Sequence, residues 1–305
     1  MMLTEVIEQL AIRKDGVYLD CTFGRGGHSQ AILKVLGPAG RLLALDRDLD
    51  AVNSPIAQTL IHDSRFAIQH CCFSNLLDVS RRIPEYQQID GILMDLGVSS
   101  PQLDSPERGF SFLKEGPLDM RMDSSQAGLS ASEWLAKVSE PHLIEVLFEF
   151  GEERFARRIA RAIVTERTTN PIVSTRQLVK IIENAVPVKE KHKHPATRTF
   201  QAIRIEINQE LEELKTALQQ TLKVLRPGGR LVVISFHSLE DRIVKRFIKS
   251  ETGTKNIPGK LPIREVDIAK GCLLKIGKAV KASPEEVEQN TRARSATLRV
   301  AEKIE

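Results

Sequence analysis

The sequence has few cysteines, no long apolar run and no large excess of charge of one sign, and each shortage excludes a class of protein. Its 305 residues include only Cys21, Cys71, Cys72 and Cys272, whose spacing fits neither a disulfide framework nor a zinc site. No apolar run approaches the roughly 18 residues of a membrane helix. The N-terminus shows no basic region followed by an apolar one, so no secretory signal is expected. These absences predict a cytoplasmic protein with no membrane partner and no metal.

The formal net charge is only +4, so nucleic acid binding would need a local basic patch and not the field of the whole protein. Hydrophobic residues make up 41% and charged residues 28% of the chain, as in soluble globular proteins. A chain of this length forms one large domain or two smaller ones.

What the sequence does contain is a glycine-rich turn between a short strand and a helix. Residues 17–19 are apolar and predict a buried strand, Asp20 follows at its end, and residues 29–36 predict a helix. Gly26 and Gly27 lie in the turn, where a ligand can approach the backbone and the free N–H groups of the helix. This arrangement is typical of the first half of a nucleotide-binding α/β unit.

Acidic residues indicate which nucleotide would bind there. Asp46 ends the next expected strand, 20 residues after Gly26, the spacing at which an acid reaches ribose hydroxyls. The turn lacks the third glycine of a dinucleotide fingerprint, and Asp20 would repel a pyrophosphate. S-adenosylmethionine carries no phosphate, so Asp20, Asp46 and Asp95 are compatible with it, and its amino group would attract a carboxylate. The alternative is a structural turn with solvated aspartates.

Strands and helices alternate along much of the chain, which predicts an α/β fold with a doubly wound, mostly parallel sheet. A long helix is expected at about 199–225, ended by Pro227-Gly228-Gly229. The last two strands are expected to form an antiparallel edge. The seven strands are expected at 17–19, 41–46, 65–70, 89–95, 230–236, 273–276 and 296–304.

No strand is expected between Asp95 and the long helix. Residues 108–122 lack a clean period and predict a long ordered loop, and a helix at 130–138 is expected to be capped by Ser130 with Glu133. Further helices are expected at 141–150, 152–168 and 175–186. We therefore predict a helical insertion at 105–195 between two parts of the sheet domain, 1–104 and 196–305.

The segment from Asp95 to Gln102 follows the fourth strand. In a methyltransferase sheet this segment faces the methyl group of S-adenosylmethionine that is transferred. Ser99 and Ser100 offer hydroxyls and backbone carbonyls that would orient the N–H bonds of an exocyclic amine. Such an amine attacks directly once it is placed in line, without a covalent enzyme intermediate. A structural turn with a capping serine is the alternative.

His237 ends the fifth expected strand, between Ser235 and Ser238. It either bonds the substrate or relays a proton, or it is a structural histidine. Glu240 and Asp241 are expected in the first turn of the following helix, where acids suit the helix dipole.

Two basic clusters lie in or beside the expected insertion. Arginine forks bind phosphates well, so we interpret both clusters as RNA contacts. Solvated helix surface is the alternative, as is ion pairing with Glu152 or Glu153. The first cluster shares one helix face and comprises Arg154, Arg157, Arg158 and Arg161, and the second comprises Lys189, Lys191, Lys193 and Arg198.

Together these stretches resemble the MraW-type family, methyltransferases that modify N4 of a cytidine in small-subunit ribosomal RNA. The resemblance spreads over nearly the whole chain. Members usually carry a short segment with His and Pro before the first helix, whereas this sequence starts at Met1-Met2-Leu3. The stretches that carry it are 18–29, 90–104 with 108–123, 194–205, 234–242 and 292–296.

The resemblance implies a class I methyltransferase domain with a helical insertion, S-adenosylmethionine as donor and the bacterial cytoplasm as location. It implies small-subunit ribosomal RNA or the small ribosomal subunit as partner. A homodimer, an NAD-dependent dehydrogenase and a non-catalytic RNA-binding factor remain open alternatives. Carried over residue by residue, the cofactor contacts are Gly26, Gly27, His28, Asp46, Phe73, Asp95 and Gln102.

Overall fold

The computed structural model describes residues 1–125, 128–188, 194–253 and 271–304. The chain forms two compact units. The sheet unit comprises Met1–Gly97 and Leu211–Glu305, and the insertion unit comprises Val98–Glu210. No helix in the described part of the chain is long and apolar enough to span a membrane.

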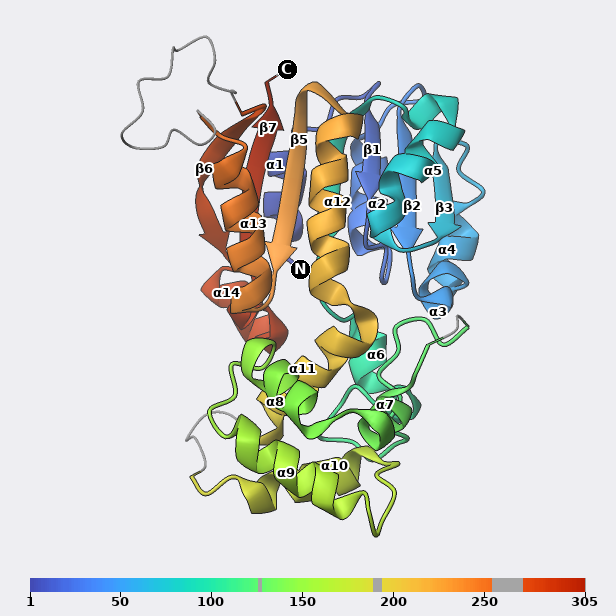
Figure 1. The fold of residues 1–305 in the computed structure, drawn as a ribbon. Coiled ribbons are helices and arrows are strands. Elements are labelled where there is room, and N and C mark those ends of the chain that lie inside the picture. Colours follow the sequence, from blue (N-terminus) through green and yellow to red (C-terminus); the bar gives the residue numbers. More distant parts are fainter. Residues whose placement is uncertain (126–127, 189–193, 254–270, 305) are drawn as a thin grey trace, which may run out of the picture. The chain divides into compact units, whose positions relative to one another are not determined.

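The sheet unit is built on seven strands in the order β3-β2-β1-β4-β5-β7-β6 (Figure 1). All neighbours pair in parallel except β7, which is antiparallel to both β5 and β6. The expected antiparallel pair of the last two strands is therefore present at one edge of the sheet. β6 is the edge strand, and β7, the strand that runs against the others, lies between β5 and β6. The strands are β1 (Val17–Asp20), β2 (Arg41–Asp46), β3 (Phe66–His70), β4 (Ile89–Asp95), β5 (Leu225–Ser235), β6 (Leu273–Lys281) and β7 (Thr297–Lys303).

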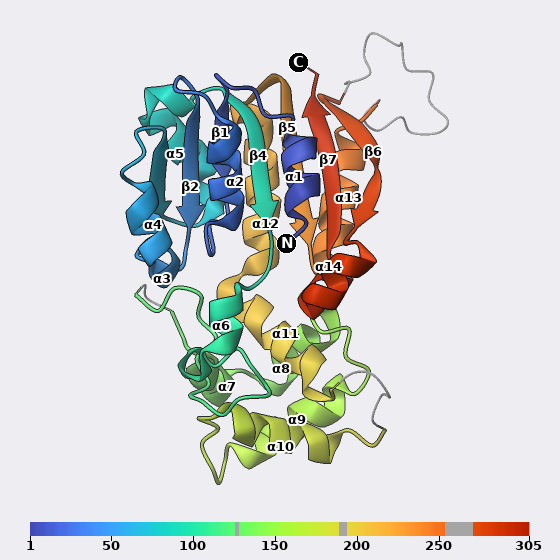
Figure 2. The same ribbon diagram turned by 180° about the vertical axis from the view of Figure 1, so that it is seen from behind.

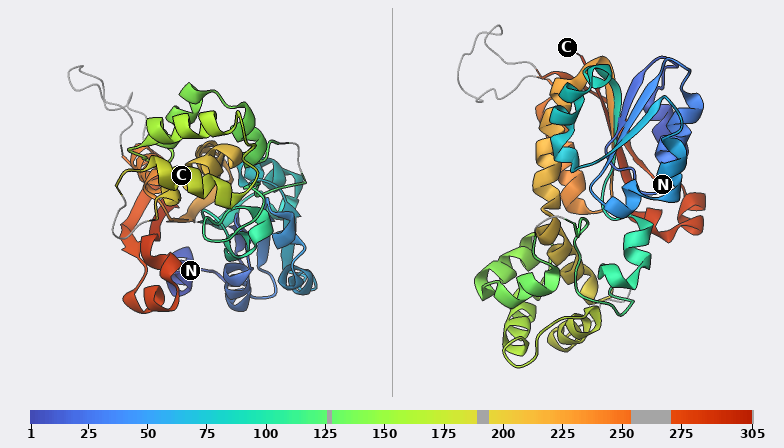
Figure 3. Two further views of the ribbon diagram at one scale, coloured as in Figure 1. Left: turned by 90° about the horizontal axis from the view of Figure 1, so that it is seen from below. Right: turned by 90° about the vertical axis from the view of Figure 1, so that its right-hand side faces the viewer.

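Helices cover both faces of this sheet (Figures 2 and 3). Successive side chains of a strand point to opposite faces. In β2, Leu42 and Ala44 belong to the core on one face, while Leu43 and Leu45 belong to the core on the other. Apolar runs buried on both sides are what a parallel sheet between helix layers requires. One face carries α1 (Leu3–Leu10), α2 (Gly27–Val35) and α4 (Pro55–Leu60), and the other carries α5 (Leu76–Arg82), α12 (Glu210–Val224) and α13 (Ser238–Ser250).

The prediction of one long helix at 199–225 is wrong, because the chain forms two helices there. α11 (Ala196–Asn208) ends at Gln209, whose φ of 51° lies in the left-handed region, and α12 follows. The Asn208 side chain accepts a hydrogen bond from the Met122 amide (2.7 Å) and donates one to the Met120 carbonyl (2.7 Å). These bonds hold the end of α11 against the loop of its own unit.

Smaller departures have local causes. Between β2 and β3 the chain forms two short helices, α3 (Leu49–Val52) and α4, because Ser54-Pro55 starts a new helix with a serine cap. β5 begins five residues earlier than expected and passes through Pro227-Gly228-Gly229 with a shift in its pairing to β4. α14 (Pro284–Gln289) was not expected.

The insertion unit is helical and has its own apolar core. It extends beyond the expected range of 105–195 at both ends, because Leu103 and Phe200 contribute to that core. The predicted Ser130 cap with Glu133 is confirmed. Its helices are α6 (Ser100–Asp104), α7 (Ala131–Lys137), α8 (Glu140–Glu149), α9 (Ala156–Glu166), α10 (Thr175–Ala185) and α11.

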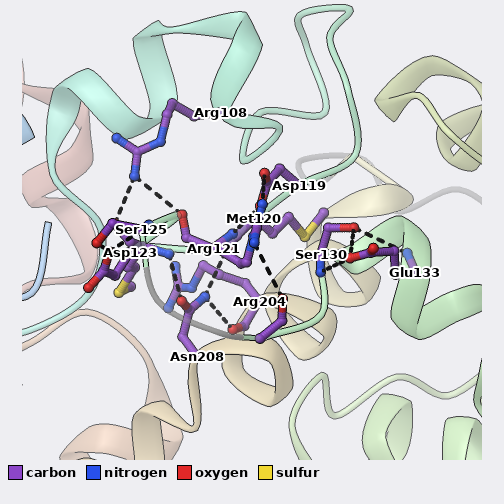
Figure 4. A network of polar contacts seen from close by, with 12 residues as sticks. Arg108, Asp119, Met120, Arg121, Asp123, Ser125, Ser130, Glu133, Arg204 and Asn208 are labelled. Atoms are coloured by element: carbon purple, nitrogen blue, oxygen red, sulfur yellow. Dashed lines mark hydrogen bonds and ion pairs between the residues drawn. The ribbon is translucent and has the colours of Figure 1, made fainter. Parts of the chain in front are cut away.

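The loop that follows Arg108 is held by polar contacts in place of regular structure (Figure 4). The Arg108 guanidinium donates to the carbonyls of Arg121 (3.2 Å) and Met122 (2.9 Å). Arg121 in turn makes two hydrogen bonds to the Asp119 carboxylate, at 2.7 and 2.8 Å. Met120 is buried between them with a φ of 61°. Side-chain hydrogen bonds from Arg108 and Arg121 thus hold the loop in a defined conformation.

Candidate active site

Three neighbouring strands of the sheet unit, β2, β1 and β4, each end in an aspartate. Asp46, Asp20 and Asp95 stand at these carboxyl ends, and the paired register places the three ends at the same edge of the sheet. Ligands of open α/β sheets bind at this edge. The prediction that Asp20, Asp46 and Asp95 end buried strands is confirmed.

Asp20 and the backbone of Asp95 are connected through Thr22. Asp20 is fully buried and accepts hydrogen bonds from the Ser29 hydroxyl (2.7 Å) and the Thr22 amide (3.1 Å). The Thr22 hydroxyl accepts a hydrogen bond from the Asp95 amide at 2.7 Å. Sequence reasoning did not identify Thr22 and Ser29, although hydroxyl residues so close to a strand-terminal acid are a usable signal.

The Asp95 carboxylate is only partly satisfied. Its Oδ2 lies 3.6 Å from Nδ1 of His28, while its buried Oδ1 has no hydrogen-bond partner among the described residues. Burial raises the pKa of Asp95, and likewise that of Asp20, to about 6, and His28 partly opposes the rise for Asp95. At neutral pH both carboxyls are therefore ionised, and a buried negative charge requires a cation or donors nearby.

Asp46 anchors the glycine turn. Its Oδ2 accepts a hydrogen bond from the Gly24 amide (2.7 Å) and its Oδ1 accepts one from the Asp48 amide (2.8 Å). Burial raises the pKa of Asp46 to about 6, and these two hydrogen bonds oppose the rise. Each carboxylate oxygen has a second acceptor position, so Asp46 can still bind a hydroxyl.

The glycine turn leaves its backbone open. Gly24 and Gly26 have φ angles of 53° and 71°, which favour glycine. A Cβ on Gly27 would meet nothing within 4 Å, so the start of α2 faces open space. A Cβ on Gly26 would instead lie 2.8 Å from the Phe23 ring. His28 is buried, and its Nε2 lies 2.9 Å from the Met1 carbonyl oxygen.

Two further predicted residues lie at strand ends of the sheet unit. Phe73 follows β3 in a short 3-10 turn and packs partly against the core. His237 follows β5 and caps α13, where its Nε2 lies 3.1 Å from the Glu240 carboxylate. Glu240 accepts a hydrogen bond from the Phe236 amide (2.8 Å), and Glu240 and Asp241 lie in the first turn of α13 as predicted. These contacts account for a structural role of His237, and its part in a reaction stays a prediction.

Ser99, Ser100 and Gln102 belong to the insertion unit. Gln102 is buried, and its side-chain oxygen accepts a hydrogen bond from the Ser99 amide at 2.9 Å, which caps α6. Ser99 is therefore the capping serine of α6, as the structural alternative for this segment predicts. The roles of these residues toward a cofactor or substrate stay predictions.

Three of the four arginines of the predicted cluster line a cavity of about 600 Å³ between α9 and α10. Arg157, Arg158 and Arg161 are exposed there, beside Glu166. Arg161 forms an ion pair with Glu140 at 3.8 Å, whereas Arg157 and Arg158 have no ion pair in the part of the chain that the structure describes. A cavity with three guanidinium groups favours an anionic ligand.

The other basic residues are placed less uniformly. The Arg154 guanidinium lies over the Phe155 ring at 5.7 Å, and Glu153 accepts a hydrogen bond from the Phe155 amide (2.9 Å). Arg198 lies on α11. The predicted contacts Lys189, Lys191 and Lys193 lie outside the described residues.

Comparison with known proteins identifies the family. The model of the MraW methylase family matches residues 1–304. The chain belongs to the MraW methylase family. Ribosomal RNA small subunit methyltransferase H of Methylococcus capsulatus is 58% identical over 307 residues, covering 99% of both chains. The protein of the same name from Pseudoalteromonas atlantica is 56% identical over 305 residues, covering 100% of this chain and 97% of its own length.

Membership of the MraW family confirms the predicted fold class and the predicted enzyme class. The seven-stranded sheet with β7 antiparallel between β5 and β6 is a class I methyltransferase fold. The protein is a methyltransferase, and the dehydrogenase alternative is not supported.

Proposed function

We propose that this methyltransferase transfers a methyl group from S-adenosylmethionine to N4 of a cytidine in the decoding region of small-subunit ribosomal RNA, in the bacterial cytoplasm. The row of aspartates at three strand ends, beside an open glycine turn, carries the proposal. Relatives named as ribosomal RNA small subunit methyltransferases support the class of RNA.

The residues at the strand ends fit S-adenosylmethionine chemically. The buried, unpartnered Oδ1 of Asp95 suits an ammonium group, and Asp46 retains acceptor positions for ribose hydroxyls. When bound, the cofactor supplies an electrophilic methyl group on a sulfonium. Gly26, Gly27 and His28 would line it from the turn, and Phe73 would contact the adenine. Gln102 is proposed as a cofactor contact on the family resemblance alone.

Methylation of an exocyclic amine requires no covalent intermediate with the protein. The amine attacks through its lone pair, so the protein must hold its N–H bonds and place the nitrogen in line. Ser99, Ser100 and Asp95 supply acceptors of the required kind. His237 is the proposed group for moving the proton that the amine releases.

The arginine cavity is the proposed contact for RNA phosphates. Arg157 and Arg158 have no ion pair among the described residues, and Arg161 has only the 3.8 Å contact with Glu140. Exposed guanidinium groups of this kind bind phosphate bidentately. Arg154, Arg198, Lys189, Lys191 and Lys193 are proposed to extend this contact.

Methylation of small subunits from cells that lack this protein tests the function. The subunits are incubated with the protein and radiolabelled S-adenosylmethionine, and the RNA is digested and mapped by mass spectrometry. We expect one N4-methylcytidine in the decoding region, and no incorporation with the Asp95→Asn variant. A methyl group on a carbon or a ribose oxygen would overturn the proposed chemistry, and an unmodified RNA would favour a non-catalytic RNA-binding role.

A further inference from the structure

A second basic cavity lies in the sheet unit, away from the strand ends that carry the aspartates. It has a volume of about 250 Å³ and lies between α13, β6 and β7. Apolar residues such as Ile248 and Ala279 line it together with four lysines. We call this cavity the lysine groove, after Lys245 and Lys249 of α13 and Lys275 and Lys278 of β6.

A bulge in the edge strand shapes the lysine groove. Ile276 of β6 pairs with Val300 of β7, and Val280 pairs with Leu298, so residues 277–279 stand opposite Arg299 alone. Gly277 turns the chain there with a φ of 61°. Bulges of this kind re-aim side chains and are frequent beside functional sites. Here the bulge carries Lys278 into the lining of the groove.

The four lysines of the groove form no ion pair within the part of the chain that the structure describes, whereas Arg299, which also lines the groove, is paired. No Asp or Glu lies among the described residues that line it. Asp241 of α13 accepts hydrogen bonds of 2.7 and 2.9 Å from Arg299, and Lys245 is near enough to help to lower the pKa of this carboxyl. Lys245 and Lys249 are four residues apart on one helix face, a like-charge spacing that destabilises a helix. Such a cluster is explained when an anion binds between its members.

Protection of the sheet edge explains only part of this charge. Lysines and bulges on an edge strand discourage pairing with another chain, and Lys275 and Lys278 could serve that purpose. Lys245 and Lys249 belong to a helix that covers the sheet face, where no strand pairing is possible. The convergence of both pairs on one cavity therefore requires another reason.

We propose that the lysine groove binds one nucleotide of the RNA substrate, with its phosphates on the lysines and its base against the apolar lining. This inference rests on RNA being the substrate, as proposed above. The volume lies below the roughly 300–1,000 Å³ of typical ligand pockets, so the groove fits one nucleotide and not a folded element. Lysines bind phosphate as point charges without base readout, so the contact is independent of RNA sequence.

Salt-dependent RNA binding tests the proposal in the full chain. Lys245→Gln with Lys278→Gln removes one cation from each side of the groove. The matched control is Lys14→Gln with Lys34→Gln, two exposed lysines elsewhere in the sheet unit. A fluorescent single-stranded RNA is titrated at several salt concentrations, and 4-thiouridine crosslinks in the same RNA are mapped by mass spectrometry. The groove variant should show a salt slope shallower by about 1.4, from about 0.7 per phosphate contact.

The possible outcomes distinguish failure of the lysine groove proposal from failure of the proposed methyltransferase function. A shallower slope in the groove variant alone, with crosslinks on α13 or β6, supports the proposal. Equal slopes in both variants, while the unchanged protein still binds RNA, overturn the groove and leave the proposed function intact. Failure of the unchanged protein to bind RNA overturns both. Competition by a poly-glutamate peptide, with no crosslink at the groove, would assign it to an acidic protein segment and also overturn the RNA proposal.

Discussion

The aspartates of the sheet unit and the arginines of the insertion unit use charge in opposite ways. Asp20 is buried and Asp46 and Asp95 are half-buried at strand ends, and desolvation raises the pKa of each carboxyl to about 6. Arg157 and Arg158 are exposed and line an open cavity. Buried charges respond to pH and little to salt, whereas exposed arginines stay charged and are screened by salt. One region therefore suits a small cation held in a fixed geometry, and the other suits a polyanion.

The largest expected effect comes from replacing Asp95 with Asn. The change removes a charge-assisted hydrogen bond worth about 1.5–3 kcal/mol, so affinity for S-adenosylhomocysteine should fall roughly 10- to 150-fold. The fold should become more stable at pH 7.5, by up to about 2–3 kcal/mol, because ionising a carboxyl whose pKa is raised opposes folding. Calorimetry measures the first effect and thermal unfolding the second. Lower affinity together with lower stability would mean that Asp95 is mainly structural.

Replacing Asp46, at the end of β2, tests a second aspartate of the same edge for comparison with Asp95. Asp46→Ala should weaken binding of S-adenosylhomocysteine about tenfold or more, through loss of the bond to ribose. This variant also removes the acceptor for the Gly24 amide, so the turn should lose local order. Binding of S-adenosylhomocysteine measured by calorimetry, beside hydrogen exchange of the Gly24 amide, separates the two losses. Unchanged affinity would place the ribose elsewhere.

The pH dependence of cofactor binding sharpens the contrast further. The carboxyls are ionised above pH 6 and protonated below it, because burial has raised each pKa to about 6. If one of them must be ionised to hold the ammonium group, affinity for S-adenosylhomocysteine should fall about tenfold per pH unit below 6. Their contribution to folding has the opposite sign, since stability from these groups falls as the pH rises through 4 to 6. A flat binding profile from pH 5 to 7.5 would remove the carboxylates from cofactor recognition.

Much of the buried region could be predicted because its signals are local. An apolar run that ends in an acid marks a strand and its carboxyl end, and this pattern placed Asp20, Asp46 and Asp95 correctly. The break at Gln209 could not be predicted, because the helical period continues across it and the left-handed residue is not glycine. The bonds from Asn208 to Met120 and Met122 that fix the break join residues far apart in the sequence.

Charge clusters are harder to interpret from the sequence because their partners are not neighbours. Glu152 and Glu153 were considered as partners for the arginine cluster, but the ion pair of Arg161 is made with Glu140 of α8. The lysine groove was not predicted at all, since its lysines come from two segments that only the sheet order brings together.

Salt dependence tests the exposed region. Arg157→Gln with Arg161→Gln should make the salt slope of RNA binding shallower by about 1.4, since about 0.7 is expected per phosphate contact on a single strand. Binding of S-adenosylhomocysteine and thermal stability should stay unchanged, because both side chains are exposed. Arg81→Gln with Arg82→Gln, an exposed pair on α5, is the matched control for net charge. A drop in stability with an unchanged slope would return this helix to a structural role.

The smallest expected effect concerns Glu166, the one acid that lines the arginine cavity within the described residues. Its carboxylate accepts a hydrogen bond from the Asn170 side chain at 3.0 Å, which the oxygen of a glutamine can also accept. Glu166→Gln therefore removes a negative charge with little change in packing. RNA bound between Arg157, Arg158 and Arg161 should be held about two- to threefold more tightly at low salt, because charges several ångströms apart in a water-exposed cavity interact by under about 1 kcal/mol. The gain should vanish at high salt, where the Debye length falls to about 3 Å. Fluorescence titration of the same RNA at low and high salt measures both quantities, and unchanged or weaker binding at low salt would place the RNA backbone away from this cavity.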